Sequence, residues 1–468
     1  MIDSSEPTLK ALSINCWGLW IVANKRRQRL EAIADWIANS SSPQPRPSRS
    51  SYHSDSSEPA TTAQGGYDVI ALQEIWVRSD YELVAERAKE AGLNYSKFFF
   101  SGAIGSGLAI LSRHPIHSSW ITPYPLNGYP LHFIQGDFFA GKSVCGICID
   151  VPRIGLVDVM NTHMYAPGGE GDGVTGAHRV AQAWELARFT REKAERGRHV
   201  LVMGDFNSQP HSIIMRIIQS CGQLLDAFSE THSSPPSITS TEHRSLSPLD
   251  QLHTHGITCD SPLNTYSAAK LKNKSSSDEV ILRGGKRLDY ILYRSPSNST
   301  SHLKATSSRL ELVDPIPSLS PPTSYSDHFA IEATFTLSTT FQNSPDSTPP
   351  EELLVPALST LHSAYRSNQT LSRTHLKLFL LSLILIPVLA VASSFEPLKW
   401  LNWVFVLLGI VDGVGGATML YVGFVGGRWE MGALRNVIGE LEDEVERIRR
   451  KRNDHQRTSS EETGQRGW

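Results

Sequence analysis

Six short polar motifs, each beside an apolar run, constrain the fold of this chain more than any other feature. The apolar runs, such as LKALSIN, YDVIALQE and HVLVMGDFN, have the length and composition of buried strands. Acids, amides and histidines at strand ends are where a sheet presents a functional site. We therefore expect these motifs to converge: Asn15, Gln73-Glu74, Thr162-His163, Gly204-Asp205-Phe206-Asn207, Leu288-Asp289-Tyr290 and Ser326-Asp327-His328.

The regions between the motifs predict an α/β domain. Within residues 1–338, apolar strands alternate with amphipathic helices, two of which are expected at 25–38 and 176–196. Such alternation is typical of sheets covered by helices. The Ser/Pro-rich stretch 40–64 cannot contribute to a core, so we expect a low-complexity insertion there. A polar, Pro-containing linker is expected at 339–374.

The composition changes after the predicted linker. Residues 378–395 form an apolar run of 18 residues without a charge, and residues 401–425 form a second run. Each run is about as long as a helix that crosses a bilayer, and only a short turn separates them. We therefore expect a hairpin of two transmembrane helices at 375–427, in preference to two core helices of a soluble domain. A tail follows at 428–468.

Basic residues flank this hairpin at its outer ends, while the turn carries a single lysine. The outer ends hold Arg366, Arg373, Lys377, Arg428 and Arg435. The positive-inside rule places both ends, and with them the α/β domain, in the cytosol. The first residues of the chain contain no apolar signal region, which agrees with this orientation. We expect a multi-pass protein of the endoplasmic reticulum or another endomembrane.

Two patterns near the hairpin predict helix association. The pairs Gly409/Gly413 and Gly423/Gly427 allow close approach, either between the two spans or between two copies of the chain. The tail predicts an amphipathic helix of coiled-coil type, with apolar residues at Leu434, Ile438, Leu441, Val445 and Ile448. Its basic end, 447–452, can instead contact anionic phospholipid and so support activation. Weak self-association through the spans or the tail is a further expectation.

The residues of the motifs suit the cleavage of a phosphodiester. Cleavage needs an attacking water, neutralisation of the charge that develops on phosphorus, and stabilisation of the leaving oxygen. A hard divalent cation held by one or two carboxylates provides the last two. Glu74 is the first candidate ligand, supported by the amide of Asn15. The motifs offer no Ser or Cys with a paired base, which a covalent mechanism would require.

The other motifs supply groups for the water and the phosphate. Asp205 and Asn207, two apart on a segment expected to be extended, point to the same side and can reach one phosphate. Asp205 would polarise the water, and Asn207 would donate to a phosphoryl oxygen. His328 is either a general base or a phosphate donor, and Asp289 can fix its tautomer. His163 is another donor to transition-state charge.

The order of the motifs resembles that of the endonuclease/exonuclease/phosphatase superfamily, over residues 9–338. Within it, the chain is most similar to the neutral sphingomyelinases and the inositol phosphosphingolipid phospholipases C. The segments that carry this resemblance are NCWG at 15–18, LQEIW at 72–76, GAIGSGL at 102–108, LNGYP at 126–130, HRVAQAWEL at 178–186 and CDSPLNT at 259–265. Two spans after the α/β domain fit the same family.

The resemblance implies a deoxyribonuclease I-like, four-layer α/β sandwich and a Mg2+-dependent phospholipase C. The substrate would be a phosphosphingolipid, either inositol phosphosphingolipid or sphingomyelin, and the products ceramide and a phosphorylated headgroup. By the same resemblance Glu74 is the magnesium ligand with Asn15 near it, and Asp327 assists the metal side. Asp205 and Asn207 would surround the nucleophile and phosphate.

In the rest of the resemblance, His328 is the base and Asp289 its partner. Asp137 and Lys142 would form a paired switch beside the active site. They lie in the segment GDFFAGKS at 136–143, which also matches the phosphate-loop pattern. That pattern requires a helix after its last residue, but Ser143 enters the alternating, strand-like run VCGICID, so we reject an NTPase. We expect Lys142 to contact the headgroup or Asp137, and the two phenylalanines to touch the membrane.

Two other readings stay open. A nuclease or an inositol-phosphate phosphatase of the same fold would use the same motifs. The formal net charge of −3 gives no basic excess for a polyanion, so we expect no nucleic-acid partner. A non-catalytic membrane adaptor is disfavoured because the polar set is complete.

Overall fold

The computed structural model describes residues 6–41, 66–132, 136–166, 174–232, 246–274, 285–339, 349–395 and 398–465. The predicted insertion at 40–64 lies almost wholly outside this set. The chain divides into two compact units. The first contains residues 1–124, 139–166 and 185–347, and the second contains residues 125–138, 167–184 and 348–468.

Two six-stranded sheets form the centre of the first unit. One has the order β11-β12-β1-β2-β4-β3, with β1 (Thr8–Asn15), β2 (Val69–Gln73), β3 (Tyr95–Phe99), β4 (Leu108–Ser112), β11 (His302–Glu311) and β12 (Ala330–Ser338). The other has the order β5-β6-β7-β8-β10-β9, with β5 (Ile116–Pro123), β6 (Ser143–Val151), β7 (Gly155–His163), β8 (His199–Asp205), β9 (Leu225–Asp226) and β10 (Asp289–Arg294).

The alternation of apolar residues in each strand places these sheets face to face. In β1, Leu9 and Ala11 point into a core shared with Ile147 and Met203 of the second sheet. Leu12 and Ile14 point the other way, against helices α1 (Arg26–Ala38) and α2 (Arg78–Ala88). On the outer side of the second sheet, Trp120 of β5 contacts Phe189 of α4 (Val174–Glu195), and Arg294 of β10 donates to the last residue of α5 (Ile213–Gly222).

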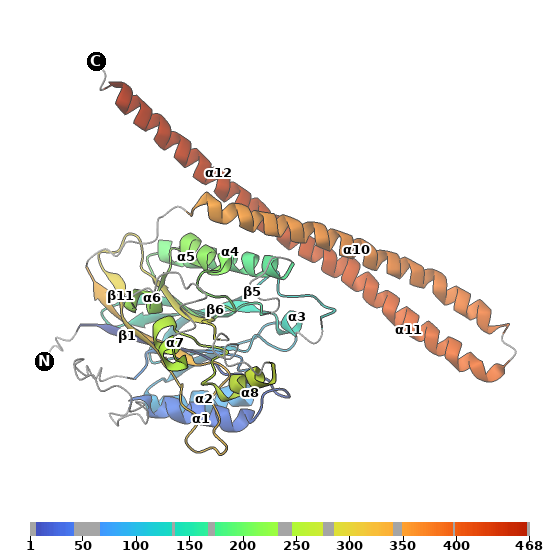
Figure 1. The fold of residues 1–468 in the computed structure, drawn as a ribbon. Coiled ribbons are helices and arrows are strands. Elements are labelled where there is room, and N and C mark those ends of the chain that lie inside the picture. The colour runs from blue at the N-terminus through green and yellow to red at the C-terminus, as the bar shows by residue number, and fades with distance from the viewer. Residues whose placement is uncertain are drawn as a thin grey trace. The chain divides into compact units, whose positions relative to one another are not determined.

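The first unit is therefore a four-layer α/β sandwich, as expected, and the helices predicted at 25–38 and 176–196 are α1 and α4 (Figure 1). The remaining described helices of this unit are short: α6 (Ala227–Thr231), α7 (Pro248–His255) and α8 (Thr265–Lys274).

The strand register brings the motifs to one edge of the sandwich. Asn15 pairs with Gln73 across parallel strands β1 and β2. In the other sheet, His163 pairs with Asp205 across parallel strands β7 and β8, and Asp205 pairs with Asp289 across antiparallel strands β8 and β10. The convergence that the sequence predicts is confirmed.

The phosphate-loop pattern at 136–143 does not form such a loop. Ser143 begins strand β6, and the helix in this segment, α3 (Asp137–Ala140), precedes that residue and has only four residues. Because the pattern needs a helix after the serine, the structure agrees with its rejection.

The second unit is dominated by a long helical hairpin (Figure 1). Its first arm is α10 (Glu351–Ser393). The second arm runs through α11 (Asn402–Leu420), a π-helical turn at Tyr421–Gly426 and α12 (Gly427–Gln465). Both arms contain a stretch that is long and apolar enough to cross a bilayer, and only about 6% of each stretch is buried. Trp400 and Trp403 lie at the turn and Trp429 at the opposite end, as in the aromatic belts of membrane proteins.

The expected linker at 339–374 is wrong in its second half, because α10 already begins at Glu351. Leu353, Ala357, Leu361 and Ala364 are buried and recur at helical spacing. In the sequence this short apolar stripe is hard to recognise, because it contains Pro356 and alternates with polar residues.

The stripe of α10 and the predicted tail helix pack on each other within the chain. The five apolar residues predicted for the tail are all buried in α12. At the basic end, Arg449 and Arg452 both donate to Glu351, with distances of 2.7 and 3.0 Å. The tail stripe is therefore covered by α10 of the same molecule, and part of its basic end is neutralised there.

Small residues set the closest approach of the two arms. A Cβ on Gly423 would lie 2.8 Å from the Cβ of His375, and one on Gly427 would lie 2.8 Å from the Cβ of Ser372. The pair Gly423/Gly427 thus joins the two arms of one chain, one of the two options predicted. Within one chain the pair Gly409/Gly413 does not make such a contact: among the described residues a Cβ on Gly409 would meet nothing within 4 Å, and one on Gly413 would meet only the tip of Ile386 at 3.9 Å. Gly416, which faces Ser382, takes this place, and association of two copies through Gly409/Gly413 stays a prediction.

We expect Gly423→Ala to destabilise the hairpin by about 1–3 kcal/mol, because the added methyl overpacks the contact with His375. Gly409→Ala adds the same methyl where nothing lies nearby and is the matched control. Unfolding of the full chain in mixed micelles, followed by circular dichroism, measures the difference. Equal stability of the two variants would contradict the packing described here.

Candidate active site

The polar residues of the motifs stand at the ends of strands from both sheets. Asn15, His163 and Asp205 are the last residues of β1, β7 and β8, and Asp289 is the first of β10. Glu74 directly follows β2 with a left-handed backbone, φ 53°. This turn carries the chain away from the strand, which leaves the carboxylate at the sheet edge.

Asn15 joins the two carboxylates at the centre of the site. Its Nδ2 donates to Oε1 of Glu74 over 3.1 Å and to Oδ2 of Asp205 over 3.0 Å. Nε2 of His163 lies 3.6 Å from the same oxygen of Asp205 and 3.9 Å from Oε1 of Glu74. One amide of the first sheet thus holds an acid from each sheet beside a shared histidine.

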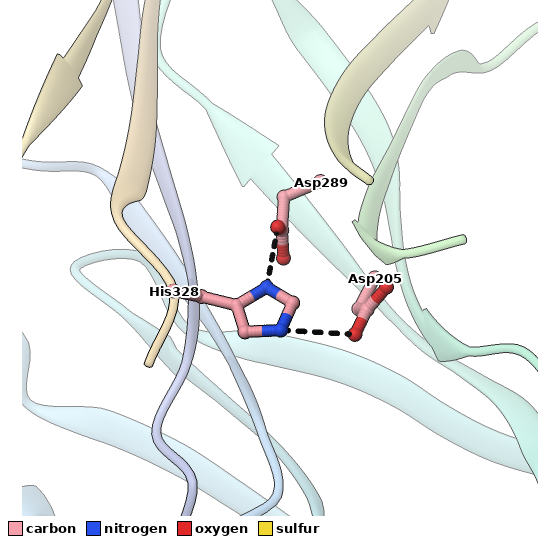
Figure 2. Close-up of side chains that lie close together, drawn as sticks. All are labelled: Asp205, Asp289 and His328. Carbon is pink, nitrogen blue, oxygen red and sulfur yellow. Dashed lines mark hydrogen bonds and ion pairs between the residues drawn. The ribbon is translucent and has the colours of Figure 1, made fainter. Parts of the chain in front are cut away.

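A second group completes the site (Figure 2). Nδ1 of His328 lies 2.8 Å from Oδ2 of Asp289, and Nε2 of His328 lies 3.9 Å from Oδ2 of Asp205. The loop that carries His328 is tied to β1, because Oγ of Ser326 donates to the carbonyl of Asn15 over 2.6 Å. The ring nitrogen opposite Asp289 therefore faces Asp205.

Asn207 lies near Asp205 but not in the way the sequence suggests. Its backbone is left-handed, φ 48°, so the expected extended segment ends at Asp205. The amide N–H of Asn207 donates to Oδ1 of Asp205, and its Nδ2 donates to the carbonyl of Met164 over 3.0 Å. A polar turn at the end of β8 overrides the strand pattern, and it orients Asp205 through the backbone.

Burial raises the pKa of both acids, Glu74 and Asp205. Burial and, second, the charge of Asp327 raise the pKa of Glu74. Burial and the charge of Asp289 raise the pKa of Asp205 to about 7. Two buried carboxylates with raised pKa values lie together here, and a bound cation would stabilise their charged forms.

The two histidines shift in opposite directions. Burial lowers the pKa of His163 well below its ordinary value, and Lys142 adds to that effect. Burial alone would also lower the pKa of His328, but its neighbours Cys259 and Asp289 outweigh burial and raise it well above the ordinary value. Near neutral pH, His163 is therefore a neutral imidazole and His328 a cation.

Several buried atoms fit a metal ion. Among the described residues, Oε2 of Glu74 and Oδ1 of Asp289 are buried without a hydrogen-bond partner. Asp205, Asp289 and His328 bring potential ligand atoms within 4.8 Å of one another. The mutual bond of His328 and Asp289 already uses two of those atoms, whereas the free oxygen of Glu74 is available. Carboxylate and amide oxygens are the ligands that Mg2+ prefers.

The remaining predicted residues take different places. Lys142 is buried, and its charge acts on Glu74 and Asp205, so it belongs to this site. Asp327 is half-buried beside Ser326, and its charge acts on Glu74. Asp137 is buried at the start of α3, and its pairing with Lys142 remains a prediction.

Two residues that hold the site were not singled out from the sequence. Arg29 is fully buried and donates to the carbonyls of Cys16, Trp17 and Tyr325, which ties the Asn15 segment to the Ser326 loop. A single arginine on an amphipathic helix gives no signal for such a role. Asn264 donates to the carbonyl of Ser326 over 2.8 Å. The sequence indicated Asn264 only as one residue of the CDSPLNT segment that carries the family resemblance.

Comparison with known proteins identifies a family and several relatives of this chain. The Endonuclease/Exonuclease/phosphatase family matches residues 12–328. The chain is 31% identical over 451 residues to the inositol phosphosphingolipids phospholipase C of Schizosaccharomyces pombe, which covers 95% of this chain and 96% of that protein. It is 32% identical over 467 residues to the protein of the same name from Saccharomyces cerevisiae, covering 95% and 91%.

Among solved structures, the beta toxin of Staphylococcus aureus is similar with a TM-score of 0.46 and 17% identity, over 69% of this chain and 99% of that one. The family match spans the strands and loops that carry the site, and the relatives extend through the hairpin. This chain belongs to the endonuclease/exonuclease/phosphatase family and, along nearly its whole length, is similar to the inositol phosphosphingolipids phospholipases C.

Proposed function

We propose that this chain is a Mg2+-dependent phospholipase C that hydrolyses phosphosphingolipids to ceramide and a phosphorylated headgroup. The observation that carries the proposal is the Asn15 amide holding Glu74 and Asp205 together opposite the His328–Asp289 pair. This arrangement suits a water attack on a phosphate ester. The names of the full-length relatives support a phosphosphingolipid as the ester.

In this mechanism Asp205 accepts the proton of the attacking water. Its pKa of about 7 makes it a suitable acceptor near neutral pH. Of the two roles considered for His328, phosphate donor is the one that its raised pKa favours, with Asp289 fixing the ring. The water oxygen bonds to phosphorus, the bond from phosphorus to the ceramide oxygen breaks, and that oxygen takes up a proton from solvent, so ceramide leaves as the alcohol. Asn207 and His163 lie beside Asp205 and complete the polar lining.

Glu74 would hold the metal, with Asn15 near it and Asp327 assisting. Magnesium, when bound, neutralises charge on the phosphoryl group and stabilises the leaving oxygen. The unpartnered oxygen of Glu74 supports this placement. Lys142 would contact the headgroup phosphate or Asp137, which we keep as a regulatory pair.

The hairpin would anchor the enzyme in an endomembrane, with the α/β domain and tail in the cytosol. Because part of the basic tail is bound to Glu351, we assign contact with activating anionic phospholipid to cations beside the spans. These are exposed: Arg366, Arg373, Lys377 and Arg428. Any weak self-association would use the spans, since α10 covers the tail stripe.

The alternative is a nuclease or an inositol-phosphate phosphatase of the same fold. The net charge of −3 disfavours nucleic acid, and the exposed apolar hairpin disfavours a purely soluble substrate. Mass spectrometry of mixed sphingolipids incubated with the detergent-solubilised protein tests the choice. We expect ceramide to accumulate with Mg2+ and not with EDTA. Turnover of plasmid DNA or soluble inositol phosphates, with no ceramide, would contradict the proposal.

We expect Glu74→Gln to weaken Mg2+ binding at least tenfold and to lower ceramide release in proportion, because it removes the negative charge next to the ion. Isothermal titration with Mg2+ reports the binding directly. Glu82→Gln, on the exposed side of α2, is the matched control. Unchanged Mg2+ affinity in the Glu74 variant would remove this residue from the metal site.

We expect Asp289→Asn to lower kcat by about 10²- to 10⁴-fold with little change in KM, because an amide no longer fixes the tautomer and charge of His328. Steady-state kinetics on mixed micelles measure both constants. Asp150→Asn, exposed on β6, should leave them unchanged. A large rise in KM with an unaltered kcat would assign Asp289 to substrate binding instead.

A further inference from the structure

An apolar groove lies on the surface of the first unit beside the site. Its walls are Leu19, Trp20, Ile21, Val22, Trp76, Val77 and Ile104, none of which carries a charge. Trp20 is 73% exposed, Ile21 88% and Val22 71%. Contiguous apolar side chains at this exposure mark an interaction surface rather than ordinary protein surface.

Each wall of the groove continues from a segment of the active site. Residues 19–22 follow the Asn15 motif, and the N–H of Gly18 donates to the carbonyl of Glu74 over 2.8 Å. Trp76 and Val77 follow Glu74 by two and three residues. The third wall, with Ile104, is joined through Gly107, whose carbonyl accepts from the N–H of Ile75. The groove therefore begins where the metal site ends.

The fold holds this apolar loop outward. Arg29 donates to the carbonyl of Trp17 over 2.7 Å and to that of Asn24 over 2.8 Å, so one buried guanidinium fixes both ends of the loop. Inside the loop, the N–H of Ala23 donates to the carbonyl of Leu19. A loop anchored in this way cannot fold its tip into the core, so its exposure has to be offset by a partner.

We propose that this groove, the Trp20 groove, inserts into the acyl-chain layer of the bilayer that holds the substrate. The proposal rests on the proposed function, because a lipid whose phosphate lies at Glu74 has its apolar part next to these residues. The uncharged lining fits hydrocarbon, and an exposed tryptophan is typical of side chains at a membrane interface. The apolar hairpin of the same chain supplies a membrane to bind.

Lipid quenching tests the insertion without any turnover. The full chain is reconstituted in phosphatidylcholine vesicles whose acyl chains carry bromine, and tryptophan emission is compared for the parent and Trp20→Phe. The difference isolates one of the ten tryptophans. We expect the Trp20 contribution to be quenched by the brominated chains and shielded from aqueous iodide. Trp120→Phe, on β5, is the control and should remove no quenched emission.

Hydrolysis rates on two forms of the substrate give a second test of the insertion. We expect Trp20→Ser/Ile21→Ser to lower the rate on vesicle phosphosphingolipid at least tenfold relative to the rate on a short-chain monomer in solution. Leu156→Ser replaces an exposed apolar residue of the same unit that does not line the groove, so it should leave this ratio unchanged. An unaltered ratio, or Trp20 emission quenched by iodide and not by bromine, would overturn the proposal. A parent that hydrolyses neither substrate refutes the proposed function instead, while the quenching result still decides the groove.

Discussion

The site depends on the two hydrogen bonds that the side-chain amide of Asn15 donates. Asn15 ends a strand of the first sheet, Glu74 follows its parallel neighbour, and Asp205 ends a strand of the second sheet. The amide thus bridges the sandwich at the edge where both sheets open. Without it, two buried acids with raised pKa values would face each other across the interface.

The segments next to this bridge are also fixed by hydrogen bonds to one another. Ser326 donates to the carbonyl of Asn15, Arg29 donates to the carbonyls of the next two residues, and Asn264 donates to the carbonyl of Ser326. The loop with His328 is fixed by the same contacts, so the ring meets Asp289 on one side and Asp205 on the other. The apolar groove is a consequence of this anchoring, since Arg29 also closes the loop that presents Trp20.

Much of this arrangement follows from the sequence, for a physical reason. Polar residues directly behind buried strands leave few places for their side chains, so the convergence of Asn15, Asp205 and Asp289 was predictable. The extended backbone predicted for Asn207 is wrong, because its left-handed conformation depends on hydrogen bonds to Asp205 and Met164 that no local sequence pattern reveals. The role of Arg29 could not be predicted, because it depends on hydrogen bonds to backbone carbonyls of other segments, one of them in the distant Tyr325 loop.

In the hairpin, too, some features follow from the sequence and others depend on packing. Its apolar runs are evident from composition, but the start of α10 depends on packing against α12, which a polar, proline-containing stretch conceals. Which glycines meet the opposite arm depends on helix phase: Gly416 and Gly423 face it and Gly409 does not.

Hydrolysis in water enriched in ¹⁸O tests the central claim most directly, because the claim is attack of water on phosphorus with the ceramide oxygen leaving. The account predicts one ¹⁸O in the phosphorylated headgroup and none in ceramide, in a reaction that stops with EDTA. Label in the ceramide hydroxyl, or release of ceramide phosphate and free headgroup, would contradict it.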